Sequence, residues 1–389
     1  MFLVDVPEHS YSDPWTATFA ERFQMFARGP LRIAYFYEKP DNSTFRYRVY
    51  NMAQVLNHYG EISASYFYLE DLDKMDRVIE MLDVLVVCRT KYSHLVNELI
   101  TRVKGRRKPV LFDVDDLVFN TDYTHLILNT LDQDLLHPDA WDFWFAYIGR
   151  IGATLRLCDG AITTNEFLAE QIRKFAGIPV SVVPNFLNKE QVSISNAVYD
   201  RKNTVGFRRD GRIHIGYFSG TPTHNKDFAL VTDALAELLS THRNAVLVVV
   251  GYMDISDQLK RLSGQVEYYP FQDFINLQRL VGRVEVNLMP LQSNVFTNCK
   301  SELKYFEAAV VGTLSVASPS FTYAGSIRDG GTGYVVKRND WYEVLHKVIA
   351  SFDNLHEIVL DARSDGMERY SWASQYSPLT RALFETMAH

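Results

Sequence analysis

Cysteine is scarce in this sequence. The 389 residues include three cysteines, Cys88, Cys158 and Cys299, which lie far apart. There is no Cys-x-x-Cys pair and no cysteine–histidine cluster, so neither a disulfide framework nor a zinc site is expected. This usage favours a reducing, cytoplasmic compartment.

Long apolar runs and an excess of basic residues are also missing. No run approaches the roughly 18 apolar residues of a membrane span, and the acidic N-terminus lacks the apolar core of a signal peptide. We therefore expect neither feature. With 40 Lys and Arg against 47 Asp and Glu, the formal net charge is −7. This charge argues against a protein that holds nucleic acid on a basic face.

The sequence does contain a regular alternation of apolar strands and amphipathic helices. Segments such as LRIAYFYE, VLVVC and AVLVVVG predict buried strands, with helix-forming stretches between them. The alternation predicts an α/β fold with doubly wound parallel sheets. A length of 389 residues suggests two domains. Ligands of such sheets bind beyond the carboxyl ends of the strands.

An aromatic stripe precedes the first strand. The residues that recur at helical spacing are Trp15, Phe19, Phe23 and Phe26. Pro14 suits the first position of a helix, with Ser12 or Asp13 as its cap. Residues 1–30 are therefore expected to be a helical extension. Two roles fit such a helix: packing on the main body, or lying on a membrane surface.

The stretch from Asn298 to Ser318, NCKSELKYFEAAVVGTLSVAS, predicts a loop, a helix, a tight stop and a short strand. Ser301 can cap the helix. Gly312 suits the left-handed position that ends a helix, and residues 314–317 have the apolar character of a core strand. The polar stripe of the helix consists of Lys300, Lys304 and Glu307.

Two interpretations fit this polar stripe. A helix N-terminus that carries two lysines suits a diphosphate, because free N–H groups and the helix dipole favour anions. Glu307 could then accept hydrogen bonds from ribose hydroxyls. The alternative is a charged helix face that contacts only water.

The segment KSELKYFEAAVVGTLSVAS, followed by YAGSIRDGGTGYVV and NDWYEVL, resembles the nucleotide-sugar half of retaining family-4 glycosyltransferases of the GT-B fold. The resemblance runs from about Leu31 to the C-terminus and is most specific in the second half. In that family a glutamate at the place of Glu307 holds the donor ribose. A second glutamate often stands eight residues earlier, where this chain has Cys299. The Ser…Lys…Glu pattern is closer to a branch that builds polysaccharides and O-antigens, rhamnosyltransferases included.

The resemblance implies two Rossmann-like domains of doubly wound parallel sheet that face each other across a cleft. The expected division is a helical extension at 1–30, an acceptor domain at 31–190, a linker at 191–211, a donor domain at 212–365 and, at 366–389, a last helix that returns to the first domain. The segment before Arg212 is polar and has no strong period, as a linker would.

The resemblance also implies a donor site. Lys226 matches a phosphate-binding lysine of the family, and the family's phosphate-binding arginine is missing, with Lys304 or His224 as its expected substitute. The expected donor-binding residues are Gly220, Thr221, His224, Lys226, Asn298, Lys300, Ser301, Lys304 and Glu307, with Tyr269 and Phe271 beside the base.

The loop after the first strand has no glycine, unlike the same loop of many GT-B enzymes. Two arginines in it, Arg46 and Arg48, could hold a phosphate or a sugar carboxylate through paired hydrogen bonds. The alternative is that both arginines face water. The expected acceptor-binding residues are Thr44, Arg46, Arg48 and Asp116.

Three aspartates, Asp113, Asp115 and Asp116, follow a buried strand. One interpretation is a divalent-metal site like the D-x-D motif of GT-A enzymes. A second is acceptor binding or proton handling by Asp115 or Asp116, and a third is turn or cap structure. Because the nucleotide features lie in the second half, no metal and no cofactor are expected.

These expectations combine into a cytoplasmic glycosyltransferase, either free or peripheral at the inner face of the cell membrane. It would move a sugar from a nucleotide-diphosphate sugar to a glycan or lipid-linked glycan, with retention of configuration and without a metal. The expected catalytic residues are Lys226, Lys304, Glu307, Asp115 and Asp116. Two alternatives remain: a non-catalytic nucleotide-sugar-binding protein on the same scaffold, or a sugar-phosphate-processing enzyme such as an epimerase or a phosphorylase.

Overall fold

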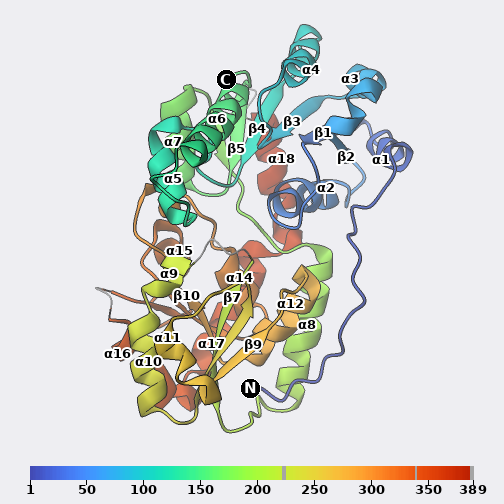
Figure 1. Ribbon diagram of the computed structural model, residues 1–389. Coiled ribbons are helices and arrows are strands. Elements are labelled where there is room, and N and C mark those ends of the chain that lie inside the picture. The colour runs from blue at the N-terminus through green and yellow to red at the C-terminus, as the bar shows by residue number, and fades with distance from the viewer. Residues whose placement is uncertain (221–224, 338–339, 386–389) are drawn as a thin grey trace.

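The computed structural model describes residues 1–220, 225–337 and 340–385. Two α/β domains lie one above the other, with their parallel sheets in separate halves of the molecule (Figure 1). The predicted fold class is confirmed.

The first domain is built on a parallel sheet in the order β2-β1-β3-β4-β5-β6. Its strands are β1 (Leu31–Tyr37), β2 (Ile62–Tyr68), β3 (Val84–Cys88), β4 (Val110–Val114), β5 (Gly160–Thr163) and β6 (Val180–Val182). Its helices are α1 (Phe19–Phe26), η1 (Arg46–Tyr50), α2 (Asn51–Leu56), η2 (Leu69–Lys74), α3 (Asp76–Met81), α4 (His94–Gly105), η3 (Thr121–Tyr123), α5 (Thr124–Thr130), α6 (Pro138–Leu155) and α7 (Glu166–Ala176). The strand order reverses between β1 and β3, which is the point where such sheets bind ligands.

The second domain has the order β12-β11-β10-β7-β8-β9, with its reversal between β7 and β10. Its strands are β7 (Ile213–Ser219), β8 (Ala245–Gly251), β9 (Val266–Tyr269), β10 (Val286–Met289), β11 (Leu314–Ala317) and β12 (Tyr334–Val335). Its helices are α8 (Lys189–Thr204), α9 (Asn225–Ala229), α10 (Thr232–Thr241), α11 (Asp257–Lys260), η5 (Ser263–Gln265), α12 (Phe274–Arg283), α13 (Val295–Asn298), α14 (Leu303–Ala309), α15 (Phe321–Ser326), α16 (Trp341–Ala350), η6 (Phe352–Asn354) and α17 (His356–Tyr370).

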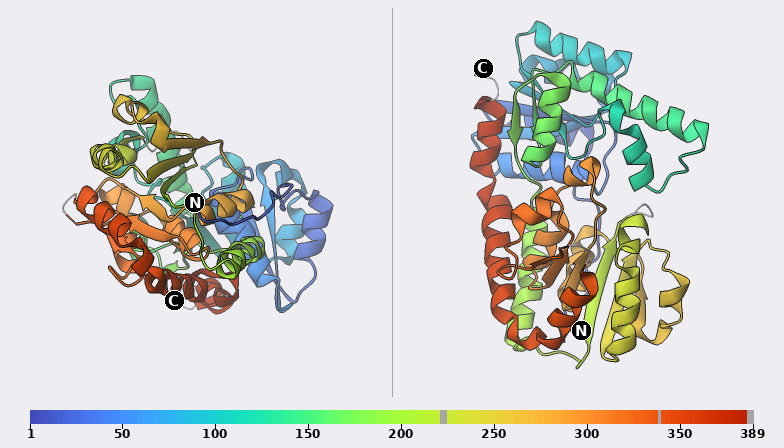
Figure 2. Two further views of the ribbon diagram at one scale, coloured as in Figure 1. Left: turned by 90° about the horizontal axis from the view of Figure 1, so that it is seen from below. Right: turned by 90° about the vertical axis from the view of Figure 1, so that its left-hand side faces the viewer.

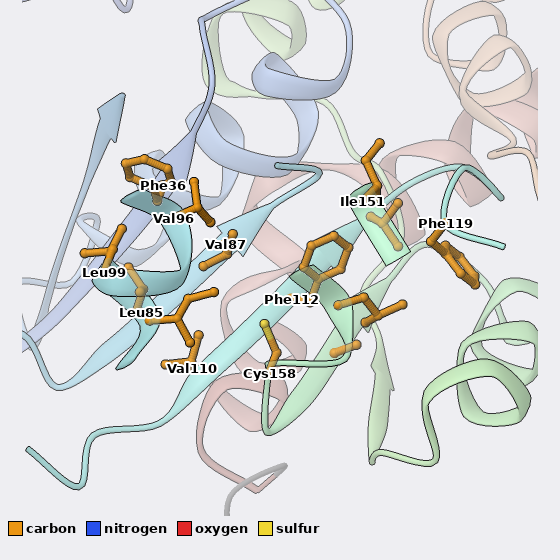
Figure 3. Close-up of a cluster of buried hydrophobic side chains, with 14 of the residues drawn as sticks. Phe36, Leu85, Val87, Val96, Leu99, Val110, Phe112, Phe119, Ile151 and Cys158 are labelled. Atoms are coloured by element: carbon orange, nitrogen blue, oxygen red, sulfur yellow. The ribbon is translucent and has the colours of Figure 1, made fainter. Parts of the chain in front are cut away.

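Apolar strands and apolar helix faces build the cores. In the first domain, Val87 of β3 and Phe112 of β4 belong to one cluster of buried side chains with Val96 and Leu99 of α4 (Figure 3). Every residue of β3 and β4 is buried, as expected of central parallel strands covered on both faces. None of the helices in the described part of the chain is long and apolar enough to cross a membrane.

The N-terminal segment runs along both domains (Figure 1). Phe2 N donates to Arg283 O of the second domain, and Trp15 lies buried against Phe274 of α12. The helix expected from Pro14 begins only at Phe19, because Trp15 is held at the domain boundary and Thr18 forms the capping box. The helix α1 packs on β2 as part of the main body, with its Phe26 fully buried.

The polar stretch expected as a linker at 191–211 is largely the helix α8. Its buried face carries Gln191, Ser195 and Lys202, which explains why the sequence shows no apolar period. Lys202 Nζ donates to the carbonyls of Val311 and Gly312 at the end of α14, where a cation is favourable. Most of the stretch expected to link the domains is therefore a regular helix, which ends at Thr204.

The chain ends with η7 (Trp372–Ser374) and α18 (Tyr376–Glu385). The helices α17 and α18, drawn in red, follow one another along one side of both domains (Figure 2). The break between them lies at residues 371–375, which include η7. Pro378 falls in the first turn of α18, where a missing N–H leaves no hydrogen bond unmade.

The docking of α18 on the first domain predicts a difference between two leucines. Leu379 is fully buried among first-domain residues that include Met52 and Leu56, whereas Leu360 of α17 is 38% exposed. Leu379→Ala should lower the free energy of unfolding by about 2–5 kcal/mol in urea titrations, because it leaves a cavity. Leu360→Ala is the control and should change it by less than about 1 kcal/mol. Equal losses for the two variants would contradict this docking.

Candidate functional site

A cavity of about 540 Å³ lies between the two domains. Its wall combines residues that follow β1, β3 and β4 of the first sheet with residues that follow β7, β8, β9 and β10 of the second. Both strand-order reversals therefore open onto the same space, which is where two such sheets bind ligands.

The segment from Lys300 to Glu307 forms one wall of the cavity. The side chains that line it include Lys300, Ser301, Lys304 and Glu307. The polar stripe expected from the sequence thus faces a cavity between domains. Ser301 is not a helix cap: α14 begins at Leu303, and the cap position is taken by Glu302, which makes no side-chain capping bond.

Lys304 supplies a positive charge to this wall. Burial lowers its pKa to about 8, against the opposing effect of Asp227. Its ammonium lies 5.0 Å from the centre of the Tyr217 ring. The charge is therefore only partly balanced, and an anion in the cavity would stabilise it.

Glu307 is held through one oxygen. Tyr47 donates its hydroxyl hydrogen to Oε1 of Glu307 at 2.5 Å, and Gln191 Nε2 donates to the same atom at 3.3 Å. Arg46 Nη2 lies 3.8 Å from Oε1. These groups gather at Oε1, and within the described residues no such contact falls on Oε2, so that oxygen is available to a ligand.

The donor-binding residues expected after β7 do not all line the cavity. Gly220 lines the cavity, while Thr221 and His224 lie outside the described residues. Lys226 is not among the described residues that line the cavity. Its Nζ donates to the main-chain and side-chain oxygens of Asn129 in α5, at 3.1 and 3.0 Å, because α9 carries it towards the first domain.

Of the two aromatic residues expected beside the base, Phe271 lines the cavity and Tyr269 lies elsewhere. Phe271 lines the cavity and is 49% exposed, with the Tyr252 ring 5.7 Å away. Tyr269 instead donates its hydroxyl to Glu267 and lines a different hollow. Asn298, also expected at the site, accepts a hydrogen bond from Phe321 N through Oδ1, which is a structural role.

The first-domain wall is built on η1, a π-helical turn at Arg46–Tyr50. Arg46 lines the cavity, with its guanidinium 4.0 Å from the Tyr47 ring centre and 4.6 Å from that of Phe274. Its Nη1 is buried and has no hydrogen-bond partner within the described ranges. An unpaired cationic donor beside a cavity favours an anionic or hydroxyl-rich ligand.

Arg48, expected to bind the acceptor, is not among the described residues that line the cavity. It is fully buried and pairs with Asp113 through Nε at 2.7 Å and Nη2 at 3.0 Å. Burial raises the pKa of Asp113 to about 6, although the charge of Arg48 opposes this shift. Arg48 lies two residues beyond Arg46 on the π turn and therefore points into the first domain.

Asp115 and Asp116 line the cavity in a network of charges. Arg89 Nη1 lies 3.3 Å from Asp115 and 3.9 Å from Asp116, and Lys300 Nζ reaches Asp116 at 3.6 Å across the cleft. Thr44 is buried and donates its hydroxyl to Asp115 at 3.1 Å. Burial raises the pKa of Asp115, against the lowering effect of Arg89. Asp113 is withdrawn from this network by Arg48, and the described residues contain no cluster of three or more potential metal ligands.

Sequence reasoning missed several residues of the site. Arg89 lies at the carboxyl end of β3 with a φ of 42°, a left-handed value that is uncommon outside glycine. Its position directly after an apolar strand could have identified Arg89 as a candidate site residue. Tyr47 and Gln191 gave no such signal, because their partner Glu307 lies more than 100 residues away in sequence.

Comparisons with known proteins fit this geometry. Residues 212–354 match the sequence model of the family Glycosyl transferases group 1. No curated protein matches the sequence. Among solved structures, the chain is similar to Anabaena HepE in complex with UDP-glucose, with a TM-score of 0.60, 11% identity, and coverage of 91% of this chain and 99% of that one.

Two further structures show the same architecture. A glycosyltransferase from Rickettsia africae has a TM-score of 0.59 at 14% identity, with 91% of this chain and 98% of that chain covered. WaaG, a glycosyltransferase involved in lipopolysaccharide biosynthesis, has a TM-score of 0.55 at 13% identity, with 92% and 100% covered. These similarities establish the two-domain GT-B fold.

Substitution of two neighbouring arginines should destabilise the protein to different extents. Arg48→Met leaves the carboxylate of Asp113 buried without its partner and should lower the free energy of unfolding by about 3–5 kcal/mol. Arg46→Met is the comparison: it removes a hydrogen bond from Nε to Asn42 O and the stacking on Tyr47 and Phe274, but leaves no tightly paired buried charge without its partner, so it should cost about 1–2 kcal/mol. Urea titration of both variants measures this difference. A stable Arg48→Met protein would contradict the structural role of Arg48.

Proposed function

We propose that this protein is a glycosyltransferase that moves a sugar from a nucleotide-diphosphate sugar to a glycan or lipid-linked glycan. The observation that carries the proposal is the interdomain cavity, in which Lys300, Lys304 and Arg46 bring positive charge close to Glu307. The match of residues 212–354 to group 1 glycosyltransferases supports the same reaction class.

The second domain is proposed to hold the donor. Lys300 and Lys304 offer ammonium groups to a diphosphate, and Glu307 offers its open oxygen to ribose hydroxyls. Phe271 and Tyr252, exposed at the ends of β8 and β9, offer ring faces to the base. Binding of UDP-glucose by the structurally similar HepE supports a nucleotide sugar as the donor.

The first domain is proposed to hold the acceptor. Thr44, Arg46 and Asp116 line its side of the cavity and can bind sugar hydroxyls. The part that WaaG plays in lipopolysaccharide biosynthesis supports a glycan acceptor. Retention of configuration rests on the resemblance to family-4 enzymes.

The reaction breaks the bond between the anomeric carbon and the diphosphate oxygen and forms a bond from that carbon to an acceptor hydroxyl oxygen. Lys300 and Lys304 stabilise the negative charge that grows on the leaving diphosphate, so a metal is not required. The acceptor proton passes to Asp115 or Asp116. Burial raises the pKa of Asp115, which makes it a stronger base than an exposed aspartate.

Nucleotide binding tests the donor site directly. The ligands to test by thermal shift are UDP, GDP, dTDP and their sugars. Those that share one nucleobase should raise the melting temperature of the protein. Glu307→Ala should remove most of that shift, whereas Glu357→Ala, which changes an exposed glutamate of α17, should keep it. If the folded wild-type protein responds to none of these ligands, the donor site is wrong.

Product analysis in the presence of EDTA then distinguishes the proposed transferase from the alternative functions. A new glycoside formed without metal supports the proposal. Binding without turnover supports the non-catalytic alternative, and an isomerised sugar or a sugar phosphate supports the other enzyme classes. The acceptors to screen are glycans and lipid-linked glycans.

The lowered pKa of Lys304 predicts how donor affinity depends on pH. A bound diphosphate favours the charged ammonium and raises its pKa, so binding takes up a proton above the free-protein value of about 8. Affinity should be constant below about pH 7.5 and fall by up to about tenfold per unit above pH 8. Calorimetry with the selected nucleotide sugar measures this profile. In Lys304→Arg, whose side chain stays charged, the fall should disappear; an unchanged profile would rule out Lys304 as its source.

A further inference from the structure

The carboxylate of Glu307 is oriented from the opposite domain. Glu307 belongs to α14 of the second domain, whereas Tyr47 belongs to η1 of the first. The hydroxyl of Tyr47 donates to Oε1 of Glu307 at 2.5 Å. The contact joins residues 260 positions apart in sequence and crosses the wall of the cavity.

Tyr47 is firmly placed for this contact. Its side chain is 2% exposed and packs in the hydrophobic core of the second domain, with its ring 6.4 Å from that of Phe306. The guanidinium of Arg46 covers the other side of the ring at 4.0 Å. A first-domain side chain is thus inserted into the second domain, directly beside α14.

The local backbone explains why Tyr47 reaches so far. In η1 the N–H of Asn51 bonds to the carbonyl of Arg46, five residues back, so the turn is wider than an α-helical turn. Such π turns re-aim side chains and occur often at functional sites. Here Arg46 and Tyr47 point to the second domain and Arg48 points to Asp113 of the first.

The hydroxyl of Tyr47 remains a donor over the working pH range. Burial raises the pKa of Tyr47 well above its usual value, and Glu307 raises it further. Gln191 Nε2 approaches the same carboxylate oxygen at 3.3 Å. These donors fix Oε1 and so restrict the orientation of a carboxylate whose residue lines the cavity.

We propose that Tyr47 is a positioning residue of the donor site. By holding Oε1 of Glu307 from the first domain, it orients the carboxylate for a ribose hydroxyl only when the two domains meet as they do here. The proposal rests on the proposed function of this cavity. It means that donor affinity depends on a residue of the acceptor domain which does not itself touch the donor.

A double-mutant cycle tests this role. Donor affinity is measured by calorimetry with UDP-glucose, or with the GDP or dTDP sugar that the wild-type panel selects, for Tyr47→Phe, Glu307→Ala and the double variant. Tyr47→Phe keeps the ring and should weaken binding about tenfold, the size expected for a hydrogen bond to a charged group. In the Glu307→Ala background the same change should have no further effect.

Tyr35→Phe provides the matched control. Tyr35 is also a fully buried tyrosine of the first domain, but its hydroxyl has no hydrogen-bond partner among the residues described. Removing that hydroxyl should leave donor affinity unchanged. Melting temperatures without ligand show whether each variant is folded.

The outcomes separate the two proposals. Wild-type affinity in Tyr47→Phe, or an equal loss with and without Glu307, overturns the positioning role while leaving the glycosyltransferase proposal intact. If the wild-type protein binds no nucleotide sugar, the proposed function fails and the role of Tyr47 fails with it. A loss that appears only when Glu307 is present supports the inference.

Discussion

The buried side chain of Arg48 fixes the geometry on which the first-domain wall depends. It pairs with Asp113 at the end of β4 and donates to the carbonyl of Val183 and to Asn185 Oδ1 on the chain that leaves the first domain. Three segments distant in sequence are thereby held together. One of them carries Arg46 and Tyr47, and another carries Asp115 and Asp116. An unpaired charge is strongly unfavourable inside a protein. The pairing of Arg48 with Asp113 therefore restricts the positions of the segments that form the first-domain wall.

Local patterns predicted much of the fold and part of the site. The alternation of apolar strands and amphipathic helices predicted doubly wound sheets, and helical periodicity placed Lys304 and Glu307 on one face of α14, whereas Lys300 precedes that helix. These features depend on neighbours along the chain. The directions of Arg48 and Lys226 depend on Asp113 and Asn129, which no local pattern connects to them. The helix α8 escaped prediction because its buried face mixes the polar Gln191, Ser195 and Lys202 with the apolar Ile194 and Val198.

The two domains line the cavity with different kinds of chemical group. The second domain offers ammonium groups, a carboxylate and exposed aromatic rings, whereas the first offers charges that are already paired, with Arg46 Nη1 as an exception among the described residues. A preformed network of paired charges suits hydroxyl-rich ligands, because each hydroxyl can replace one existing hydrogen bond. Structural neighbours at 11–14% identity share this architecture.

The position of α18 has a consequence for biosynthesis. This helix supplies Leu379 and Leu383 to a core that otherwise consists largely of residues from the first half of the chain. A ribosome releases those leucines only after it has made the whole second domain. The first domain therefore leaves the ribosome before Leu379 and Leu383 can complete this core, although its strands are synthesised first. During that interval the nascent chain exposes a surface of the kind that chaperones recognise.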